Sequence, residues 1–148
     1  MNVRHDLRPG DLGRVTELHG VLYAAEYGFE IGFEAYVAAS LAEVATGRLW
    51  LAEQDGRLVG CIGMLGREDG TWQLRWFLVH PAARGQGLGR RLLGEALAFA
   101  SGPVYLWTVD PLVEAARLYT AAGFRLTEEL APKPLWGQML REQRYDRR

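Results

Sequence analysis

The stretch Arg84–Gly89, which reads Arg-Gly-Gln-Gly-Leu-Gly, constrains the fold of this chain more than any other segment. It follows the apolar run Trp76–Val79 and leads into a helix-like segment from Arg90. This order predicts a strand, a glycine turn and the N-terminus of a helix. Glycines let successive backbone N–H groups gather around an anion, and the first turn of a helix adds unpaired N–H groups with a partial positive charge. The loop therefore predicts a phosphate-bearing ligand.

Two widespread phosphate-binding loops have a different pattern. A P-loop carries Lys followed by Ser or Thr after its last glycine, whereas Gly89 is followed by Arg90 and Arg91. A dinucleotide-binding loop reads Gly-x-Gly-x-x-Gly with an acidic residue about 20 residues later. Neither condition is met here. The sequence therefore disfavours both NTP hydrolysis and dinucleotide binding.

The spacing Arg84-x-x-Gly87-x-Gly89 after Val79-His80-Pro81 resembles the acetyl-CoA pyrophosphate loop of the GNAT superfamily of acyl-CoA N-acyltransferases. Residues 115–125 resemble that superfamily's second signature, a helix that carries Ala and Tyr, ends in Gly-Phe and leads into a strand. The order and the separation of the two signatures also fit.

Two further stretches widen the resemblance. Residues 3–11 resemble the usual first strand and the start of helix one, so the likeness covers nearly the whole chain. More narrowly, residues 19–28 resemble the acetyltransferase domain found fused behind MarR-type winged-helix regulators. The DNA-binding part of such regulators is expected to be absent here.

Hydrophobic periodicity and turn signals predict the order of the elements. Pro9-Gly10-Asp11 supplies turn chemistry and an N-cap for the first helix. Turns at Asp55-Gly56 and Asp69-Gly70 join three strands that we expect to pair antiparallel. The predicted helices cover 11–27, 33–46, 87–101 and 113–122. The predicted strands cover 2–8, 48–54, 57–66, 71–79, 103–109 and 124–130, with a last one within about 138–146.

These elements predict one domain of the α/β (α+β) class over residues 1–148. A chain of this length buries roughly 70% of its unfolded surface around one core. The resemblance implies a GNAT-like mixed, mostly antiparallel sheet of six to seven strands with about four helices. It also implies that the sheet is splayed between strands 4 and 5.

Composition and charge exclude several classes of protein. A formal net charge of −1 argues against nucleic acid as a partner. The single cysteine, Cys61, cannot form an internal disulfide and is expected to be a small buried residue. No apolar stretch is long enough to span a bilayer, and residues 1–6 lack a signal-peptide core, so we expect a cytoplasmic protein without membrane contact. No Cys, His or Asp cluster has metal-ligand spacing, so no metal is expected.

The resemblance implies acetyl-CoA as the cosubstrate and assigns its contacts. The pyrophosphate would lie on the N–H groups of residues 85–90, and the pantetheine arm would pair with the strand that ends at Val79. The Val79 N–H would face the thioester oxygen. Ala115 would leave room for acetyl-CoA, whereas Leu112 stands where many relatives carry Asn. The cofactor-binding set is Phe77, Leu78, Val79, Arg84, Gly85, Gln86, Gly87, Leu88, Gly89, Arg90, Ala115 and Tyr119.

Two side chains are predicted to be catalytic. Tyr119 matches the tyrosine that, in many relatives, gives a proton to the CoA thiolate or at least hydrogen-bonds it, and the alternative is an aromatic residue packed on the sheet. One branch of the family uses a glutamate on the fourth strand as general base, but residues 71–79 contain no carboxylate. Glu26 is the candidate because it shares a helical face with His19 and Tyr23. The alternatives are a solvated Glu26, His19 acting or packing locally, or a chain of waters without a dedicated base.

The sequence thus predicts an N-acetyltransferase that moves the acetyl group of acetyl-CoA to a primary amine of a small molecule or peptide, by direct transfer in a ternary complex. The alternative is a non-catalytic acyl-CoA-binding sensor or partner subunit, which the missing fourth-strand glutamate favours. The tryptophans are expected mostly in the core, although Tyr105 and Trp107 could shape an acceptor pocket. Three carboxylates near its expected entrance suit a cationic amine: Glu26, Glu30 and Glu34. The apolar segment 136–140 permits a homodimer.

Overall fold

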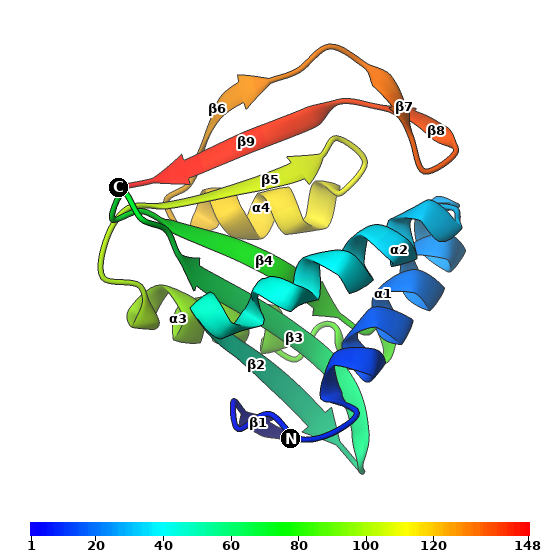
Figure 1. Cartoon of the computed structure of the whole chain (residues 1–148), viewed down its shortest axis with the longest axis vertical. Coiled ribbons are helices and arrows are strands. Elements are labelled where there is room, and N and C mark those ends of the chain that lie inside the picture. Colours follow the sequence, from blue (N-terminus) through cyan, green and yellow to red (C-terminus); the bar gives the residue numbers. More distant parts are fainter.

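Seven strands form one central sheet in the computed structural model, which describes residues 1–148 (Figure 1). Their order is β1-β2-β3-β4-β5-β9-β6, and all neighbours are antiparallel except the parallel pair β4 and β5. A separate two-stranded hairpin joins β7 and β8. The strands are β1 (Asn2–Arg4), β2 (Gly47–Gln54), β3 (Arg57–Gly66), β4 (Trp72–Val79), β5 (Val104–Val109), β6 (Arg125–Glu129), β7 (Lys133–Leu135), β8 (Gln138–Leu140) and β9 (Glu142–Arg147).

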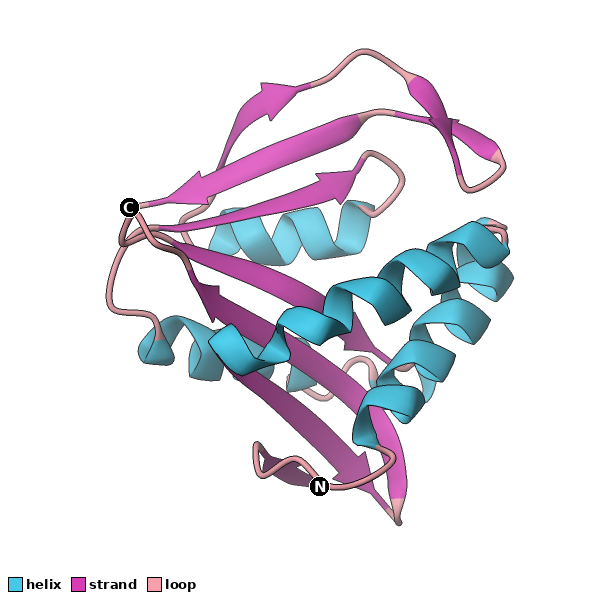
Figure 2. Cartoon of the chain, viewed as in Figure 1, coloured by secondary structure: helices cyan, strands magenta, loops and turns pink.

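Helices cover both faces of the sheet, α1 and α2 on one and α3 and α4 on the other (Figure 2). They are α1 (Asp11–Tyr27), α2 (Ile31–Ser40), α3 (Leu88–Phe99) and α4 (Val113–Ala121), with 3₁₀ turns η1 (Leu41–Thr46) and η2 (Pro81–Ala83). The predicted mixed, mostly antiparallel sheet with about four helices is confirmed. None of the helices combines the length and the hydropathy that a membrane crossing requires.

Two hydrophobic cores lie on the two faces of the sheet. In β2, Leu49 and Leu51 pack under α1 and α2, whereas Trp50 and Ala52 pack under α3 and α4. Successive side chains of a strand point to opposite faces, so a strand that is covered on both faces is apolar at nearly every position. This explains why residues 49–52 form a continuous buried run.

The two parallel strands separate soon after they meet. β4 and β5 pair only at Trp72 with Val104 and at Gln73 with Tyr105, and beyond this point they diverge (Figure 1). This divergence is the splay expected between the fourth and fifth strands. It leaves the second half of β4 without a partner on one side.

A β-bulge lies in the middle of β4. Its register against β3 shifts between Cys61 and Gly63, and Trp76 has a left-handed φ of 50°, which is unfavourable for a bulky residue. A bulge reverses the alternation of side chains, so Leu74 packs under α3 and α4 while Trp76 packs under α1 and α2. Gly63 permits this arrangement, because a Cβ there would lie 2.3 Å from Cε3 of Trp76. The bulge therefore sets the direction of the side chains in the second half of β4.

Cys61 is fully buried beside this bulge. Its thiol donates a hydrogen bond to the carbonyl of Trp76 at 3.1 Å. Burial raises the pKa of the thiol to about 12, so it stays protonated at neutral pH. The expectation of a small buried residue is confirmed.

A buried ion pair, rather than a side-chain N-cap, fixes the start of α1. The guanidinium of Arg4 donates to both carboxylate oxygens of Asp11, at 2.9 and 2.8 Å, and the Arg8 N–H donates to the same carboxylate at 2.7 Å. These bonds hold the pKa of Asp11 well below its usual range. Gly10 occupies the N-cap position. The predicted helix 11–27 is confirmed, but the first strand ends at Arg4 because the chain then turns around this ion pair.

Two further segments differ from the expected elements. The helix predicted over residues 33–46 begins at Ile31, ends at Ser40 and continues as the 3₁₀ turn η1. The last strand begins at Glu142, because residues 133–140 form the β7–β8 hairpin instead.

Long-range packing explains why the sequence did not reveal this hairpin. Its turn consists of Trp136 and Gly137, with φ values of 51° and 84°, whereas Asn-Gly or Asp-Gly is the usual signal. The Trp136 ring lies 5.1 Å from that of Phe29 and 4.8 Å from that of Phe33, between centroids. The Glu30 N–H donates to the Trp136 carbonyl at 3.0 Å. Contacts with α2 and the residues before it thus stabilise a turn that the local sequence does not favour.

The same packing bears on the expected dimer segment, residues 136–140. Leu140 is buried and Trp136 is half-buried within their own chain, whereas Met139 is exposed. A homodimer therefore stays a prediction.

Candidate active site

The loop between β4 and α3 presents a row of backbone donors. Gly85 and Gly87 have φ values of 77° and 78°, in the left-handed region that favours glycine. The N–H groups of residues 85–90 donate no backbone hydrogen bond, and Arg91 is the first residue to do so, to the Gly87 carbonyl at 3.0 Å. Unpaired N–H groups at a helix N-terminus are available to an anion. This row is therefore suited to a phosphate group.

Close packing holds the loop at the end of the sheet. The Nδ1 atom of His80 accepts a hydrogen bond from the Ala82 N–H at 3.0 Å and so caps the 3₁₀ turn η2. Leu88, the first residue of α3, is buried in the core. A Cβ at Gly89 would meet Cδ1 of Leu118 in α4 at 3.1 Å, so only a small residue fits here without a shift. The protein itself thus anchors the loop.

A cavity of about 570 Å³, the loop cavity, lies between this loop, the second half of β4, the start of α4 and the end of α1. The His80 N–H donates to the Val59 carbonyl at 2.7 Å. Antiparallel pairing alternates, so the N–H and C=O of Val79 point away from β3 and toward the gap beside β5. The Val79 carbonyl accepts a hydrogen bond from Nε of Arg84 at 3.1 Å. The cavity is thus bounded by a strand edge that no other strand pairs with and by the row of donors.

Most of the residues assigned to acetyl-CoA from the sequence line the loop cavity. Gln86 is an exception, because it is exposed and its side chain points back toward the Ala82 carbonyl at 3.5 Å. Tyr119 is the other exception and lies in the neighbouring cavity. Leu112 adds an apolar side chain to both cavities. The assigned residues that line the loop cavity are Phe77, Leu78, Val79, Arg84, Gly85, Gly87, Leu88, Gly89, Arg90 and Ala115.

Glu26 lies in the loop cavity beside Arg84. Its carboxylate oxygens accept hydrogen bonds from Nη1 and Nη2 of Arg84 at 2.9 and 2.7 Å, and this pairing raises the pKa of the guanidinium. Glu26 does not line the neighbouring cavity, and neither do Glu30 and Glu34. The structure therefore places Glu26 next to the glycine loop and away from the second cavity.

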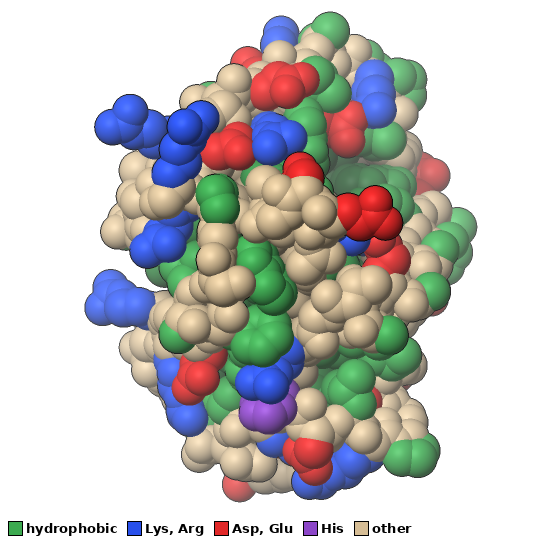
Figure 3. Space-filling view, turned by 60° about the vertical axis from the view of Figure 1, so that its left-hand side comes forward, with side chains coloured by type: hydrophobic (Ala, Val, Ile, Leu, Met, Phe, Trp, Pro, Cys, Tyr) green, Lys and Arg blue, Asp and Glu red, His purple; other side chains and the backbone are tan.

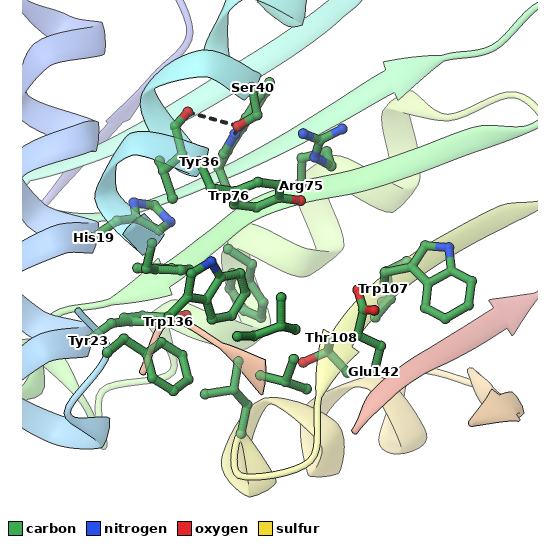
Figure 4. A pocket seen from close by; sticks show the side chains of 18 of the residues that line it. His19, Tyr23, Tyr36, Ser40, Arg75, Trp76, Trp107, Thr108, Trp136 and Glu142 are labelled. Carbon is green, nitrogen blue, oxygen red and sulfur yellow. Dashed lines mark hydrogen bonds between the residues drawn. The ribbon is translucent and has the colours of Figure 1, made fainter. Parts of the chain in front are cut away.

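This second cavity, the aromatic cavity, has a volume of about 370 Å³ and lies between α1, α2, the β7–β8 hairpin and the diverging ends of β4 and β5 (Figure 4). Trp136 and Tyr23 point into it, whereas Trp107 points away at its edge and is 37% exposed. Tyr105 does not line it. Its ring-bearing residues are His19, Tyr23, Phe29, Phe33, Tyr36, Trp76, Phe77, Trp107, Tyr119 and Trp136.

The two cavities adjoin each other. Both are lined by Tyr23, Phe77 and Leu112. A ligand that extends along β4 from the glycine loop therefore reaches the wall of the aromatic cavity. This junction is where a group could pass from one bound molecule to another.

Tyr119 lies at the aromatic cavity in a cluster of rings. Its ring centroid is 6.0 Å from that of Phe77 and 5.7 Å from that of Phe124. Burial raises the pKa of Tyr119 above the ordinary phenol value, and it does the same for Tyr23. Neither hydroxyl has a hydrogen-bond partner in the protein, and neither is sealed from the cavity. Tyr119 is thus a packed ring that keeps its phenolic proton at neutral pH.

His19 is almost fully buried at the base of the aromatic cavity. Its Nδ1 atom lies 2.8 Å from the Val15 carbonyl, which can only accept, so Nδ1 carries the proton and Nε2 holds a lone pair. Burial lowers the pKa of His19 to about 4. The imidazole is therefore neutral at pH 7.

The charged groups of the aromatic cavity are already paired. Glu142 is its only lining carboxylate and lies 2.7 Å from Nζ of Lys133. Arg75 lies 3.2 Å from a carboxylate oxygen of Glu43. No group of three or more His, Cys, Asp and Glu side chains lies close enough together to hold a metal ion. The cavity therefore presents rings and neutral hydroxyls rather than an unpaired charge.

Sequence reasoning missed the importance of the hairpin for this cavity. Trp136 was expected to be an ordinary core residue, and Glu142 was not singled out. The run of aromatic residues Tyr27, Phe29, Phe33 and Tyr36 was a usable signal, because it clusters rings at the α1–α2 junction where Trp136 docks.

Comparison with known proteins gives matches along the whole chain. Residues 45–126 match the family described as the acetyltransferase (GNAT) domain. A mycothiol acetyltransferase of Thermobispora bispora is 32% identical over 138 residues, which are 92% of this chain and 44% of that protein. The chain spans between 33% and 44% of the length of the first curated relatives that it matches.

Solved structures agree with the sequence matches. A GNAT-family acetyltransferase from Staphylococcus aureus Mu50 superposes with a TM-score of 0.81 at 20% identity, covering 99% of this chain and 97% of that one. YncA from Salmonella typhimurium, solved with its cofactor acetyl-CoA, gives a TM-score of 0.73 at 21% identity, covering 99% and 92%. The narrower likeness to domains fused to MarR-type regulators stays a prediction. The family match and the shared fold establish that the chain belongs to the GNAT acetyltransferase family.

Proposed function

We propose that this chain is an N-acetyltransferase that moves the acetyl group of acetyl-CoA to a primary amine by direct transfer in a ternary complex. The observation that carries the proposal is the junction of the two cavities. One cavity ends in the unpaired N–H groups of residues 85–90, and the other offers a separate space for an acceptor. A cytoplasmic location accords with this proposal.

The residues of the loop cavity fit the parts of acetyl-CoA. The N–H row and the guanidinium of Arg90 suit the pyrophosphate, whereas the guanidinium of Arg84 already donates to Glu26 and to the Val79 carbonyl. A Cβ at Gly85 or Gly87 would meet nothing within 4 Å, so the space above these glycines is open. The free edge of β4 at Val79 suits the amide groups of the pantetheine arm, in the manner of an added strand.

The chemistry at the junction follows from these positions. The lone pair of the amine nitrogen attacks the thioester carbon, and the carbonyl oxygen gains negative charge that a backbone donor such as the Val79 N–H stabilises. Collapse of this intermediate breaks the C–S bond and releases the thiolate. Tyr119 donates its phenolic proton to the sulfur, because it is neutral, unpaired and lines the cavity. The attacking nitrogen loses its extra proton to water, and a proton from water restores the phenol, whose raised pKa disfavours a lasting phenolate.

We assign no carboxylate as general base. Glu26 is paired with Arg84 in the loop cavity, and Glu142 is paired with Lys133 at the aromatic cavity. An apolar environment disfavours the charged ammonium form, so the acceptor loses its proton to water as it enters. The rate should therefore rise with pH until the acceptor amine in solution is fully deprotonated.

One observation favours a non-catalytic acyl-CoA-binding protein as the second candidate. No unpaired carboxylate lines the aromatic cavity, so a silent sensor would also fit the paired charges.

Calorimetric titration with acetyl-CoA, followed by a thiol-release assay with a panel of amines, separates the two functions. Micromolar binding with amine-dependent thiol release is the expected result. Binding without release from any amine would favour the sensor, and the absence of binding would refute both functions.

A further inference from the structure

We propose that the acceptor is a small primary amine attached to an apolar ring or a body of similar size, rather than a polyamine, an aminosugar or a peptide. This inference rests on the proposed function and concerns the aromatic cavity alone. The cavity combines a rigid ring-lined floor, a limited volume and an absence of unpaired carboxylates.

The floor of the aromatic cavity is built from rings that hold one another. Tyr23 and Phe33 stack with centroids 4.8 Å apart and planes 5° from parallel. Trp136 packs edge-on against Phe33 at 4.8 Å and lies 5.7 Å from Tyr36. Rings packed in this way are ordered before a ligand binds. A planar apolar group therefore gains the most binding free energy from contact with them.

The backbone also fixes the position of Trp136. The Glu30 N–H donates to the Trp136 carbonyl, and the Gln138 amide donates to the Tyr27 carbonyl. These two bonds join the hairpin to the α1–α2 junction. The ring wall is therefore part of the folded structure rather than a mobile loop.

The charges around the cavity disfavour acceptors with several cationic groups. A second ammonium group inside it would need a free carboxylate, but Glu142 is paired with Lys133. Arg75, also at the cavity, is paired with Glu43, and this carboxylate is shared with Arg67, so it is not free for a ligand ammonium either. His19 is neutral at pH 7 and adds no negative charge. A ligand with a single amine that reacts in its neutral form needs no carboxylate in the cavity and brings no second charge into it.

The size of the aromatic cavity and the direction of its opening also favour such an amine. A volume of about 370 Å³ lies at the low end of small-molecule sites, which suits a ring with a short side chain but not a folded peptide. The junction with the loop cavity lies at Tyr23, Phe77 and Leu112. The amine would point toward this junction and Tyr119, while the apolar body contacts Trp136 and Phe33.

The first test uses phenethylamine as the probe. Spermidine and glucosamine represent the polar acceptors that the inference disfavours. Calorimetry measures phenethylamine binding to the CoA-saturated protein, and thiol release measures kcat/KM for each amine with acetyl-CoA. We expect phenethylamine to bind and to have at least a tenfold higher kcat/KM than either polar amine. A polar amine with the higher kcat/KM, or no binding of phenethylamine, would overturn the inference.

The outcomes also separate this inference from the proposed function. Phenethylamine binding without thiol release from any amine would refute the transferase function while supporting the class of ligand. Thiol release with polar amines alone would support the transferase and refute the ligand class.

Variants in the β7–β8 hairpin test whether phenethylamine contacts Trp136. Trp136→Ala should raise KM for phenethylamine about tenfold and leave KM for acetyl-CoA within twofold. Trp136→Phe should restore most of the affinity, which distinguishes lost ring contact from misfolding. Met139→Ala is the matched control, because Met139 is an exposed apolar residue of the same hairpin. An equal loss in Met139→Ala, or no change in Trp136→Ala, would contradict the assignment.

Discussion

The loop cavity and the aromatic cavity adjoin each other, yet they are built in opposite ways. The loop cavity takes its main donors from backbone groups of one continuous stretch, residues 85–90. The aromatic cavity takes side chains from α1, α2, β4, β5 and the β7–β8 hairpin. A binding site made of adjacent backbone groups keeps its donors when the surrounding side chains change. A pocket made of side chains from distant elements changes its lining when any one of those elements changes.

The electrostatics of the two cavities differ as well. The loop cavity is lined by Arg90 and the positive end of α3, which suit an anion, while its Arg84 is paired with Glu26. Charges at the aromatic cavity are paired or neutral. Elsewhere, the face drawn in Figure 3 shows acidic and basic side chains interspersed, in keeping with the net charge of −1. The N–H row of residues 85–90 and Arg90 are therefore the features of the loop cavity that suit a phosphate-bearing ligand.

The largest expected effect comes from Gly87→Val. The new side chain would fill the open space above the N–H row, so we expect the Kd for acetyl-CoA to rise at least ~100-fold, about 2.7 kcal/mol of binding free energy. Isothermal calorimetry measures this change. Gly70→Val is the matched control, because Gly70 has a similar φ of 83° and equally open surroundings but lies in a distant turn. Similar affinities in the two variants would show that the loop does not hold the phosphate.

Tyr119→Phe tests the junction between the cavities. Removing one phenolic hydroxyl should lower kcat about 100-fold, the low end of the roughly 10²–10⁴-fold that general acid catalysis contributes, and should leave the Kd for acetyl-CoA within twofold. Steady-state thiol release and calorimetry give the two quantities. Tyr145→Phe is the control, since the Tyr145 ring packs 6.0 Å from that of Tyr119 but does not line either cavity. If both variants lose the same activity, the role of Tyr119 is packing.

The pH dependence of stability probes the aromatic cavity alone. Burial lowers the folded-state pKa of His19 to about 4, below the unfolded value of about 6.5, so the unfolded chain binds more protons between these values. The contribution of His19 to stability is therefore complete above pH 6.5 and is lost as pH falls toward 4. We expect the wild type to lose about 2 kcal/mol more than His19→Gln between pH 7 and pH 4.5. Urea unfolding at both pH values measures this difference, and parallel curves would contradict it.

Glu26→Gln has the smallest expected effect. It distinguishes a Glu26 that only pairs with Arg84 from a Glu26 that acts as general base. The ion pair with Arg84 is partly exposed, with side-chain exposures of 24% and 46%, so its loss should change stability by less than about 0.5 kcal/mol. Removal of a negative charge beside the phosphate site should strengthen acetyl-CoA binding by about threefold, with kcat within twofold. Calorimetry and thiol release measure both. A large fall in kcat would instead restore Glu26 as the general base.

The fold could be predicted where local signals were strong. The helix 11–27, the Asp55-Gly56 hairpin and the strand–loop–helix unit around residues 84–90 follow from periodicity and turn residues. The β7–β8 hairpin could not be predicted, because Trp136 adopts its turn conformation only through packing on Phe29 and Phe33. The bulge at Trp76 depends on space above Gly63 in the neighbouring strand, which no local pattern reports.

The candidate site divides in the same way. The N–H row was predictable, since it depends on glycines and a helix N-terminus that are adjacent in sequence. The placement of Glu26 was not, because a shared helical face does not tell which cavity that face borders.

The sequence by itself determined the family, the order of most elements and the position of the glycine loop, because these depend on spacing between near neighbours. Only the tertiary structure decided which side chains meet at the aromatic cavity, that Glu26 pairs with Arg84, and that Trp136 closes the ring wall. The physical reason is that such contacts depend on the divergence of β4 from β5 and on the docking of a hairpin more than 100 residues away from α1 in the chain. Patterns among neighbouring residues in the sequence do not indicate which distant segments come into contact.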